Sequence, residues 1–440
     1  MLSSNTQTIA DITGGISAAD VEFEGVYTDT REDGKGKLFI ALEGDSFDGH
    51  DFIQHAEDSG AKAIIAHKKL STNLPTITVG NTEEAYRAIA SWHRQLFSPI
   101  VIAITGSNGK TSTKNMLANI LSTDAPTLFT QGNLNNHLGV PKTLLNIKKE
   151  HKYCVIEMGA NHVNEISLLC HLSKPKFAII TNANNAHLGE FGSIDNLVKA
   201  KGEILGALPT SGVAFINANS AHKSTWKKIA GNRKCVLFGE NTTVFATDIV
   251  EQKDLLQFTL RCNNEATAVT LNMIGKHQVE NALAATACAV QLGIDIKHIK
   301  QGLESTVPEK GRLNLLHCHG FTILDDSYNA NPHSMKAAID TLSANAGETI
   351  AVLGSMAELG SESSELHQEI GDYLRASPVT EMYTIGDDAK HYQGNQCDDI
   401  ESLYKHLCKH HQDATILIKG SRSMQLDKLV NLFAKTTNST

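Results

Sequence analysis

The stretch TGSNGKTST at residues 105–113 combines two glycines, a lysine and several hydroxyl groups directly after the apolar run IVIAI. A turn of this kind between a strand and a helix offers backbone N–H groups to an anion. Lys110 would reach the outer phosphates of a nucleotide, and Thr111 would offer its hydroxyl to Mg²⁺. The longer P-loop pattern needs glycine where Ile104 stands, so this is a compressed GxxGKT variant that still favours phosphate binding over a plain turn. The other loop residues expected to contact ATP are Gly106, Asn108, Gly109 and Ser112.

Two strand-end side chains are candidate metal ligands. Glu157 ends the apolar run YCVIE, and a carboxylate at that place in the sheet of a phosphate loop commonly holds Mg²⁺. His187 follows the apolar run FAIIT and would supply a second ligand. Taken alone, Glu157 is equally well explained as a residue that caps the end of its strand. His187 taken alone would need no metal, because most of the 20 histidines need none.

Lys201 lies in a predicted helix within residues 193–208. One apolar stripe with helical period runs along this helix, formed by Leu197, Val198, Ile204, Leu205 and Leu208. Lys201 falls in the stripe, where a lysine requires a partner or loses its charge. The alternative is a side chain that extends along the stripe to solvent at a domain edge. The residues alone leave both interpretations open.

The last third of the chain carries a further set of strand-end residues. The runs FTILDD, TIAVLG, EMYTIG and ATILIKG alternate with helical stretches and predict a small doubly wound domain, in which ligands bind outside the carboxyl ends of the strands. Arg312 presents a forked donor set suited to phosphate, although a surface ion pair is the commoner role of an arginine. Asp326 is placed for a ribose hydroxyl and Tyr328 for stacking on a base. Lys419 and Ser421 follow the last strand of the same rim.

A histidine-rich stretch near the end of the chain looks like a metal-binding set, namely His406, Cys408, His410 and His411. These residues are predicted on a polar helix, where such spacings arise by chance, so we favour the interpretation without a metal. The HCH sequence at 317–319 is interpreted as strand.

The alternation of short β-rich runs with helical stretches predicts an α/β architecture with mostly parallel sheets. Pro99 breaks the chain after a helical stretch, and a third unit begins near VPEKGR. We therefore expect three domains, at residues 1–98, 99–311 and 312–440, which suits a chain of 440 residues.

Composition narrows the classes of function. A formal net charge of −9 argues against a nucleic-acid partner. Eight cysteines without a CxxC pair favour a reduced, cytoplasmic protein, and the N-terminus shows no secretory signal. No apolar run approaches the roughly 18 residues of a membrane span. We expect a monomer.

With these residues in view, the chain resembles the Mur ligases, the ATP-dependent amide-forming enzymes of peptidoglycan synthesis. The resemblance spans nearly the whole chain and is closest to members that join D-alanyl-D-alanine to UDP-N-acetylmuramoyl-tripeptide through an acyl phosphate. It rests on TGSNGKTSTKNML, QGNLNNHLGVPKTLL, VIEMGANHVNEI, AHLGEFGS, AKGEI, DDSYNANPHSM, AELG and KGSRSM, and on the N-terminal TDTREDGKGKLFIALEGDSFDGHDFI.

The resemblance implies an N-terminal UDP-sugar-binding α/β domain, a central P-loop ATPase domain and a C-terminal Rossmann-like domain. It implies ATP, two Mg²⁺ ions, and a carbamylated lysine at Lys201 that holds metal with Thr111, Glu157 and His187. Arg312, Asp326 and Asn281 would contact the phosphate, ribose and adenine of ATP. Thr30 and Arg31 would bind the uridine nucleotide. The acceptor channel would be lined by Asn133, Asn135 and Asn136.

The sequence departs from the family pattern at two places. Ser355 stands where aspartate is usual, and HLGEFGS permutes the usual HLEGFGS. The alternative functions are a sister ligase that adds diaminopimelate, lysine or glutamate, and a nucleotide-gated UDP-sugar sensor without turnover. The DNPR signature of the diaminopimelate enzymes is absent, since the corresponding stretch reads NANPHS. A folate-polyglutamating relative would lack the N-terminal TDTR segment. A sensor would not need a second metal.

Overall fold

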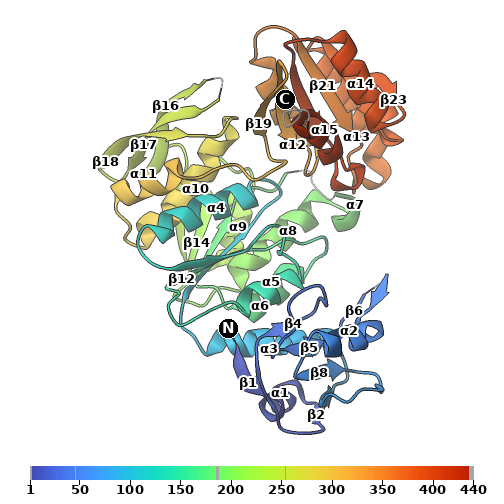
Figure 1. The fold of residues 1–440 in the computed structure, drawn as a ribbon. Helices are drawn as coiled ribbons and strands as arrows, with labels where there is room; N and C mark the ends of the chain where they lie inside the picture. Colours follow the sequence, from blue (N-terminus) through green and yellow to red (C-terminus); the bar gives the residue numbers. More distant parts are fainter. Residues whose placement is uncertain (1, 45, 185–187, 253, 436–440) are drawn as a thin grey trace. The chain divides into compact units, whose positions relative to one another are not determined.

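The computed structural model describes residues 2–44, 46–184, 188–252 and 254–435 (Figure 1). The chain packs into two compact units. The first comprises residues 1–103, 125–159 and 165–176, and the second comprises residues 104–124, 160–164 and 177–440. The predicted three-domain boundaries at residues 98 and 311 stay predictions. Within the described residues, no helix combines the length and the apolar character that crossing a membrane requires.

The N-terminal part of the first unit contains a five-stranded sheet of order β2-β9-β8-β5-β4. Its central strands are apolar on both faces and fully buried, as in a sheet covered by helices. The long helix α3 begins at Asn81, whose side chain accepts the backbone N–H groups of Glu83 and Glu84. The elements are β1 (Ser3–Asn5), α1 (Thr6–Thr13), β2 (Ile16–Ser17), β3 (Glu22–Glu24), β4 (Val26–Tyr27), β5 (Leu38–Ile40), β6 (Glu43–Gly44), β7 (Phe47–Asp48), η1 (Gly49–Phe52), α2 (Ile53–Asp58), β8 (Ala63–Ala66), β9 (Thr76–Thr78) and α3 (Thr82–Gln95).

The middle of the chain builds a six-stranded sheet of order β11-β12-β10-β13-β14-β15. The pairs β11–β12, β13–β14 and β14–β15 are parallel, as the near-continuous apolar runs predicted. The elements are β10 (Ile100–Thr105), α4 (Lys110–Ser122), β11 (Thr127–Phe129), α5 (Gly139–Leu144), β12 (Tyr153–Glu157), α6 (Glu165–Ser173), β13 (Phe177–Ile180), α7 (Leu188–Phe191), α8 (Ile194–Gly206), β14 (Val213–Asn217), α9 (Lys223–Ala230) and β15 (Lys234–Phe238).

An antiparallel sheet of order β16-β17-β18 follows, and the sequence analysis did not predict it. Along β17, buried residues alternate with more exposed ones, which is the pattern of a sheet with one covered face. Helix α11 packs against β18 and α4. The elements are β16 (Val244–Glu251), β17 (Leu256–Cys262), β18 (Glu265–Leu271), α10 (His277–Gln291) and α11 (Ile296–Glu304).

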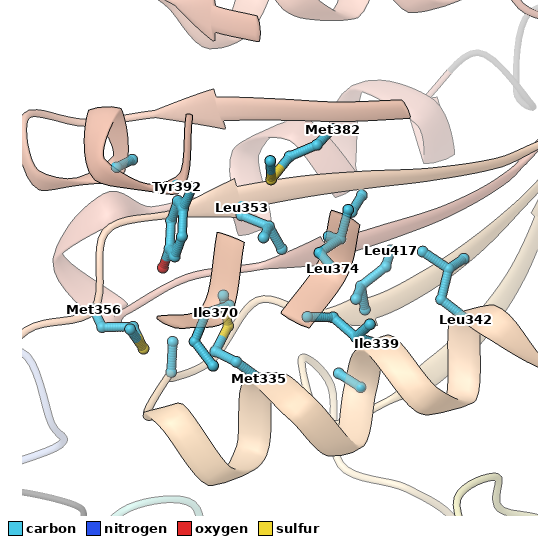
Figure 2. Close-up of a cluster of buried hydrophobic side chains, with 14 of the residues drawn as sticks. Met335, Ile339, Leu342, Leu353, Met356, Ile370, Leu374, Met382, Tyr392 and Leu417 are labelled. Atoms are coloured by element: carbon cyan, nitrogen blue, oxygen red, sulfur yellow. The ribbon is translucent and has the colours of Figure 1, made fainter. Parts of the chain in front are cut away.

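The C-terminal sheet has the order β19-β20-β24-β21-β22-β23 and is parallel except for the β19–β20 pair. Figure 2 shows the core on one of its faces, where Met335 and Ile339 of α12 and Ile370 of α13 meet Leu353 and Leu417 of the sheet. The elements are β19 (Asn314–Cys318), β20 (Phe321–Asp326), α12 (Pro332–Ser343), β21 (Thr349–Gly354), η2 (Gly360–Glu362), α13 (Ser363–Arg375), β22 (Glu381–Ile385), η3 (Asp388–Tyr392), β23 (Asn395–Cys397), α14 (Ile400–His410), β24 (Thr415–Lys419), η4 (Arg422–Met424) and α15 (Asp427–Lys435). The predicted doubly wound domain is confirmed.

The contact between α4 and α11 gives a stability prediction. A Cβ added at Gly302 of α11 would lie 2.3 Å from the Cα of Ile120 in α4. Because backbone atoms must move to admit it, Gly302→Ala should destabilise the protein by about 1–3 kcal/mol and lower the thermal unfolding midpoint. Gly206→Ala in α8 is the matched control, since its Cβ would meet Ile229 at an ordinary 3.7 Å. Equal midpoints for the two variants would contradict the packing of α4 on α11.

Candidate active site

The loop between β10 and α4 requires glycine at two positions. A Cβ at Gly106 would lie 1.9 Å from the Oγ1 of Thr181, and a Cβ at Gly109 would lie 2.2 Å from the Oδ1 of Asn281. Gly109 also has φ +77°, a conformation that other residues rarely adopt. The loop therefore lies directly against the end of β13 on one side and against α10 on the other.

Hydrogen bonds fix the shape of this loop. The backbone N–H of Ser107 donates to Asn182 O at 3.0 Å, and that of Asn108 donates to Asn182 Oδ1 at 2.9 Å. Thr181 Oγ1 donates to Asn108 O at 2.6 Å. Ser107 Oγ donates to Asn184 O and accepts the Asn184 N–H. A loop fastened at successive residues holds its conformation before any ligand binds, which lowers the entropic cost of binding.

The N-terminus of α4 has the chemistry of an anion site. Its N-cap is Gly109, which has no side chain to cap the helix. The N-terminus of a helix directs backbone N–H groups and the positive end of the helix dipole outward, and both favour an anion. Lys110 Nζ donates to the carbonyls of Gly106 at 2.7 Å and Ser107 at 3.1 Å, which places the ammonium over the loop. Thr111 is buried and Ser112 half-buried in the first helical turn.

Asn281, expected to contact adenine, lies beneath the loop. Asn281 is 5% exposed. Its Nδ2 donates to Gln278 Oε1 at 2.9 Å, and its Oδ1 accepts the Thr113 hydroxyl at 3.3 Å. These contacts, with the close approach to Gly109, make Asn281 a support for the loop conformation. The adenine contact stays a prediction.

The predicted C-terminal residues meet at the carboxyl ends of β20 and β24. The guanidinium carbon of Arg312 is 4.3 Å from the ring centroid of Tyr328, and the buried Nε of Arg312 has no hydrogen-bond partner among the described residues. Lys419 Nζ donates to Asp326 Oδ2 at 2.6 Å and to Asn329 O at 2.9 Å. The free Arg312 donor is what a phosphate contact requires, whereas Asp326 is already paired.

Lys419 and Ser421, expected to contact the substrate, are each 2% exposed. The Oγ of Ser421 accepts the Ala357 N–H at 2.7 Å, so Ser421 holds the loop after β21. Lys419 forms an ion pair with Asp326. In this structure both side chains brace the rim, and their contact with a substrate stays a prediction.

Two further residues at this rim were not predicted from the sequence. Asn331 caps α12, and its Nδ2 donates to Asn108 Oδ1 at 2.7 Å, which joins the phosphate loop to the C-terminal segment. An asparagine before proline at a helix start was the available signal. The second is His277, where burial and the nearby charges of Lys419 and His333 together lower the imidazole pKa to about 4. Its imidazole is therefore neutral at pH 7.

The structure buries Lys201 together with its stripe. The residue is 1% exposed, its Nζ donates to Ala160 O at 3.4 Å, and it lies 5.4 Å from the ring centroid of Phe191. A side chain that extends to solvent is therefore excluded. On the same helix, Glu203 accepts the Asn164 N–H at 2.6 Å.

In the first unit, the structure brings Glu157 and the 133–136 loop together. Glu157 is 1% exposed, and its Oε1 accepts Asn135 Nδ2 at 2.8 Å. Its backbone N–H donates to Thr130 Oγ1 at 3.0 Å. Asn136 Oδ1 accepts the Gly139 N–H at the start of α5, and Asn133 is exposed. Glu157 is thus a buried carboxylate with a polar neighbour rather than a simple strand-end cap.

The predicted uridine-binding residues lie on an exposed loop of the same unit. The Arg31 guanidinium holds Asp29 with both ends of its fork, at 2.9 Å and 2.6 Å, and keeps the pKa of Asp29 at about 2. Thr30 is half-buried beside it. Glu32 accepts Lys142 Nζ of α5 at 2.6 Å, which ties the loop to α5. The guanidinium of Arg31 is therefore exposed and is paired with the Asp29 carboxylate.

His187 lies outside the described residues. The two departures from the family pattern fall on hydrogen-bonded loops. Ser355 Oγ accepts the Ala389 N–H at 3.1 Å, and the Gly189 N–H of the HLGEFGS stretch donates to Glu358 O at 3.1 Å. Ser355 thus makes a hydrogen bond within the fold, but it lacks the negative charge that an aspartate would carry at this position.

Family models match three successive parts of the chain. They are described as Mur ligase family, catalytic domain, at residues 22–94, Mur ligase middle domain, at residues 104–289, and Mur ligase, glutamate ligase domain, at residues 311–422.

Among curated relatives, the chain is 39% identical to the UDP-N-acetylmuramoyl-tripeptide–D-alanyl-D-alanine ligase of Escherichia coli (strain K12), with 98% of each chain covered. It is 31% identical to the ligase of the same name from Bacillus subtilis (strain 168), again with 98% of each covered. A crystal structure of MurF from Acinetobacter baumannii has a TM-score of 0.93 at 33% identity, with 99% of each chain covered. MurF ligase from Thermotoga maritima in complex with ADP has a TM-score of 0.84 at 28% identity, covering 94% of this chain and 98% of that one. The chain belongs to the Mur ligase family.

Proposed function

We infer that this chain is an ATP-dependent ligase that joins D-alanyl-D-alanine to the terminal carboxylate of UDP-N-acetylmuramoyl-tripeptide, with ADP and phosphate as further products. The observation that carries this function is 39% identity over 98% of the chain to a ligase that bears that name. The hydrogen-bonded loop ahead of α4 supports this function, because a rigid loop at a helix N-terminus suits the phosphates of ATP.

The reaction needs ATP because a carboxylate does not react with an amine unaided. Transfer of the γ-phosphoryl group to the tripeptide carboxylate makes an acyl phosphate and releases ADP. The amine of D-alanyl-D-alanine then attacks the carbonyl carbon, and phosphate leaves from the tetrahedral intermediate as the amide forms. Phosphoryl transfer depends mainly on positioning and on neutralising charge. Water must be excluded, since it would hydrolyse the acyl phosphate.

The residues of the second unit supply cationic and N–H donors for the phosphates. Lys110 and the first-turn N–H groups of α4 would hold the β- and γ-phosphates, with Gly106, Asn108, Gly109 and Ser112 shaping the loop around them. Arg312 would add a further phosphate contact through its unpaired Nε. Asp326 and Tyr328 would contact the ribose and the base, and Asp326 would then share its carboxylate with Lys419.

Mg²⁺ is the expected metal, and the available donors fit it, because Mg²⁺ prefers oxygen ligands. Thr111 offers a hydroxyl in the first turn of α4, and Glu157 offers a buried carboxylate. His187 is proposed for a second ion. Bound Mg²⁺ would neutralise the negative charge of the phosphates.

Lys201 is proposed to act as a carbamate. Burial favours the neutral amine of a lysine, and a neutral amine can take up CO₂. The product is an anionic oxygen group, the ligand type that Mg²⁺ prefers. The 1% exposure of Lys201 supports this proposal, since an ammonium here is removed from water.

The other substrate contacts follow the family resemblance. Thr30 and Arg31 are proposed for the uridine nucleotide, and the exposed Arg31 guanidinium suits a diphosphate. Asn133, Asn135 and Asn136 are proposed for the acceptor channel, with Lys419 and Ser421 at the C-terminal rim. Residues 1–98, 99–311 and 312–440 would then serve the UDP-sugar, ATP and the incoming amine, respectively.

A product assay tests the proposed function against its alternatives. When the chain is incubated with ATP, a panel of UDP-muramoyl peptides and a panel of amino acids and dipeptides, mass spectrometry should find UDP-muramoyl-pentapeptide from the tripeptide and D-alanyl-D-alanine. Phosphate release should require both substrates. Products with diaminopimelate, lysine or glutamate would identify a sister ligase, and no phosphate release with any pair would identify a sensor.

The carbamate at Lys201 gives a second prediction. Lys201→Ala should reduce ligation by about 100-fold or more, because a metal-positioning group is lost. Acetate should restore part of the activity by filling the vacated space with a carboxylate. Lys201→Arg should not be rescued, since its guanidinium stays cationic.

The control for this prediction is Lys199→Ala, an exposed lysine of the same helix, which should keep full activity. After incubation with ¹³C-bicarbonate, NMR should show a carbamate signal in the parent protein that Lys201→Ala lacks. Full activity of Lys201→Ala, or no carbamate signal in the parent, would contradict the proposal.

A further inference from the structure

The amino ends of the C-terminal strands carry a cluster that the proposed reaction does not use. Glu348 immediately precedes β21, Glu381 is the first residue of β22, and His411 follows α14 ahead of β24. Asp326 and Lys419 are the last residues of β20 and β24. Because these strands are parallel, the cluster lies at the opposite edge of the sheet from the proposed ligation residues.

His411 is the centre of this cluster, contrary to its predicted place on a polar helix surface. Helix α14 ends at His410, and the side chain of His411 is only 5% exposed. Its Nδ1 lies 2.8 Å from Glu348 Oε1, and its Nε2 lies 3.9 Å from Glu381 Oε2. The two carboxylates therefore flank one buried imidazole, each on its own side of the ring.

Tyr383 completes the surroundings of His411. Its hydroxyl donates to Glu381 Oε2 at 2.7 Å and lies 3.0 Å from His411 Nε2 and 3.1 Å from His406 Nε2. Tyr383 therefore adds a hydroxyl oxygen to the polar groups that surround the His411 ring.

The cluster has an excess of negative charge. Within the described parts of the chain, no lysine or arginine nitrogen lies within 4.0 Å of the carboxylate of Glu348 or Glu381, and His411 is the basic group that both approach. Like charges held near one another in a partly buried place repel each other. A bound cation would remove that repulsion.

We propose that Glu348, Glu381 and His411 form a binding site for a divalent transition-metal ion, for which Zn²⁺ is the probe. One ligand atom from each residue lies within 4.8 Å of the others. Ligands around a tetrahedral Zn²⁺ at about 2.0–2.2 Å are roughly 3.4 Å apart. Because an ion bonds to one imidazole nitrogen only, binding requires side-chain rotations that bring both carboxylates to the same nitrogen of His411. An imidazole with carboxylates suits Zn²⁺, whereas Mg²⁺ prefers oxygen ligands alone. His406 is the nearest further nitrogen donor for a fourth position.

The site would fasten three separate segments of the C-terminal sheet. An ion held by Glu348, Glu381 and His411 connects the starts of β21 and β22 with the connection from α14 to β24. A ligand that binds the folded state alone stabilises it in proportion to its concentration. The ion therefore acts on stability at the edge away from the ATP rim and takes no part in the ligation steps.

Metal binding to the full-length protein tests this site. Calorimetric titration of the chelator-treated protein with Zn²⁺ should show one equivalent bound, and saturating Zn²⁺ should raise the thermal unfolding midpoint. Co²⁺ in its place should give the intense visible absorption of a tetrahedral ion. His411→Gln and Glu381→Gln should each weaken Zn²⁺ binding at least tenfold and abolish the thermal shift. Each variant should keep a ligation activity near that of the parent, which verifies that it is folded.

The neighbouring His410 supplies the matched control. It stacks near His406 on the exposed face of α14, with ring centroids 4.5 Å apart, and this pair could chelate a metal by itself. His410→Gln should bind Zn²⁺ as the parent does. No bound equivalent in the parent, or binding that survives His411→Gln and Glu381→Gln but is lost in His410→Gln, would overturn the proposal. If both glutamine variants fail to fold, Glu348→Gln takes their place with the same expected loss.

Discussion

The proposed ATP site depends on the absence of side chains at Gly106 and Gly109. At each position a Cβ would lie within about 2 Å of a side-chain oxygen, of Thr181 in one case and of Asn281 in the other. The loop can therefore approach the end of β13 and α10 closely enough for its backbone to be hydrogen-bonded from Ser107 to Asn108. A turn fixed in this way holds the N-terminus of α4 in place without further ordering, and a rigid site gains affinity for phosphate because less entropy is lost on binding.

The loop is also held by a residue that is far from it in the sequence and lies in the C-terminal segment. Asn331 reaches Asn108 with its amide, and Arg312 lies over Tyr328 at the start of that segment. The loop that would hold the phosphates and the strand ends that would hold the nucleoside are thus linked by direct contacts. Glu348 and His411 lie at the opposite edge of the C-terminal sheet, where a metal ion is proposed to stabilise the fold.

The sequence predicted what depends on local pattern. Apolar runs predicted the parallel strands, and the glycines with Lys110 predicted the loop between β10 and α4. For Lys201 the apolar stripe left burial and an extension to solvent open, and the structure buries it. The sequence did not predict pairings made across the chain. The antiparallel sheet β16–β18 was missed, and so were the contact of Asn331 with Asn108 and the burial of His411. Each of these depends on which distant segments meet, and a residue's type and spacing do not carry that information.

The account depends most on the claim that the loop at residues 105–111 binds the phosphates of ATP for the ligation of two substrates. The most direct measurement compares Lys110→Ala with the parent protein in two assays, the ligation rate and the affinity for UDP-N-acetylmuramoyl-tripeptide. The account predicts that the variant loses ATP-dependent ligation and still binds the UDP-tripeptide, because other residues are proposed to hold that substrate. Ligation at the parent rate would contradict it.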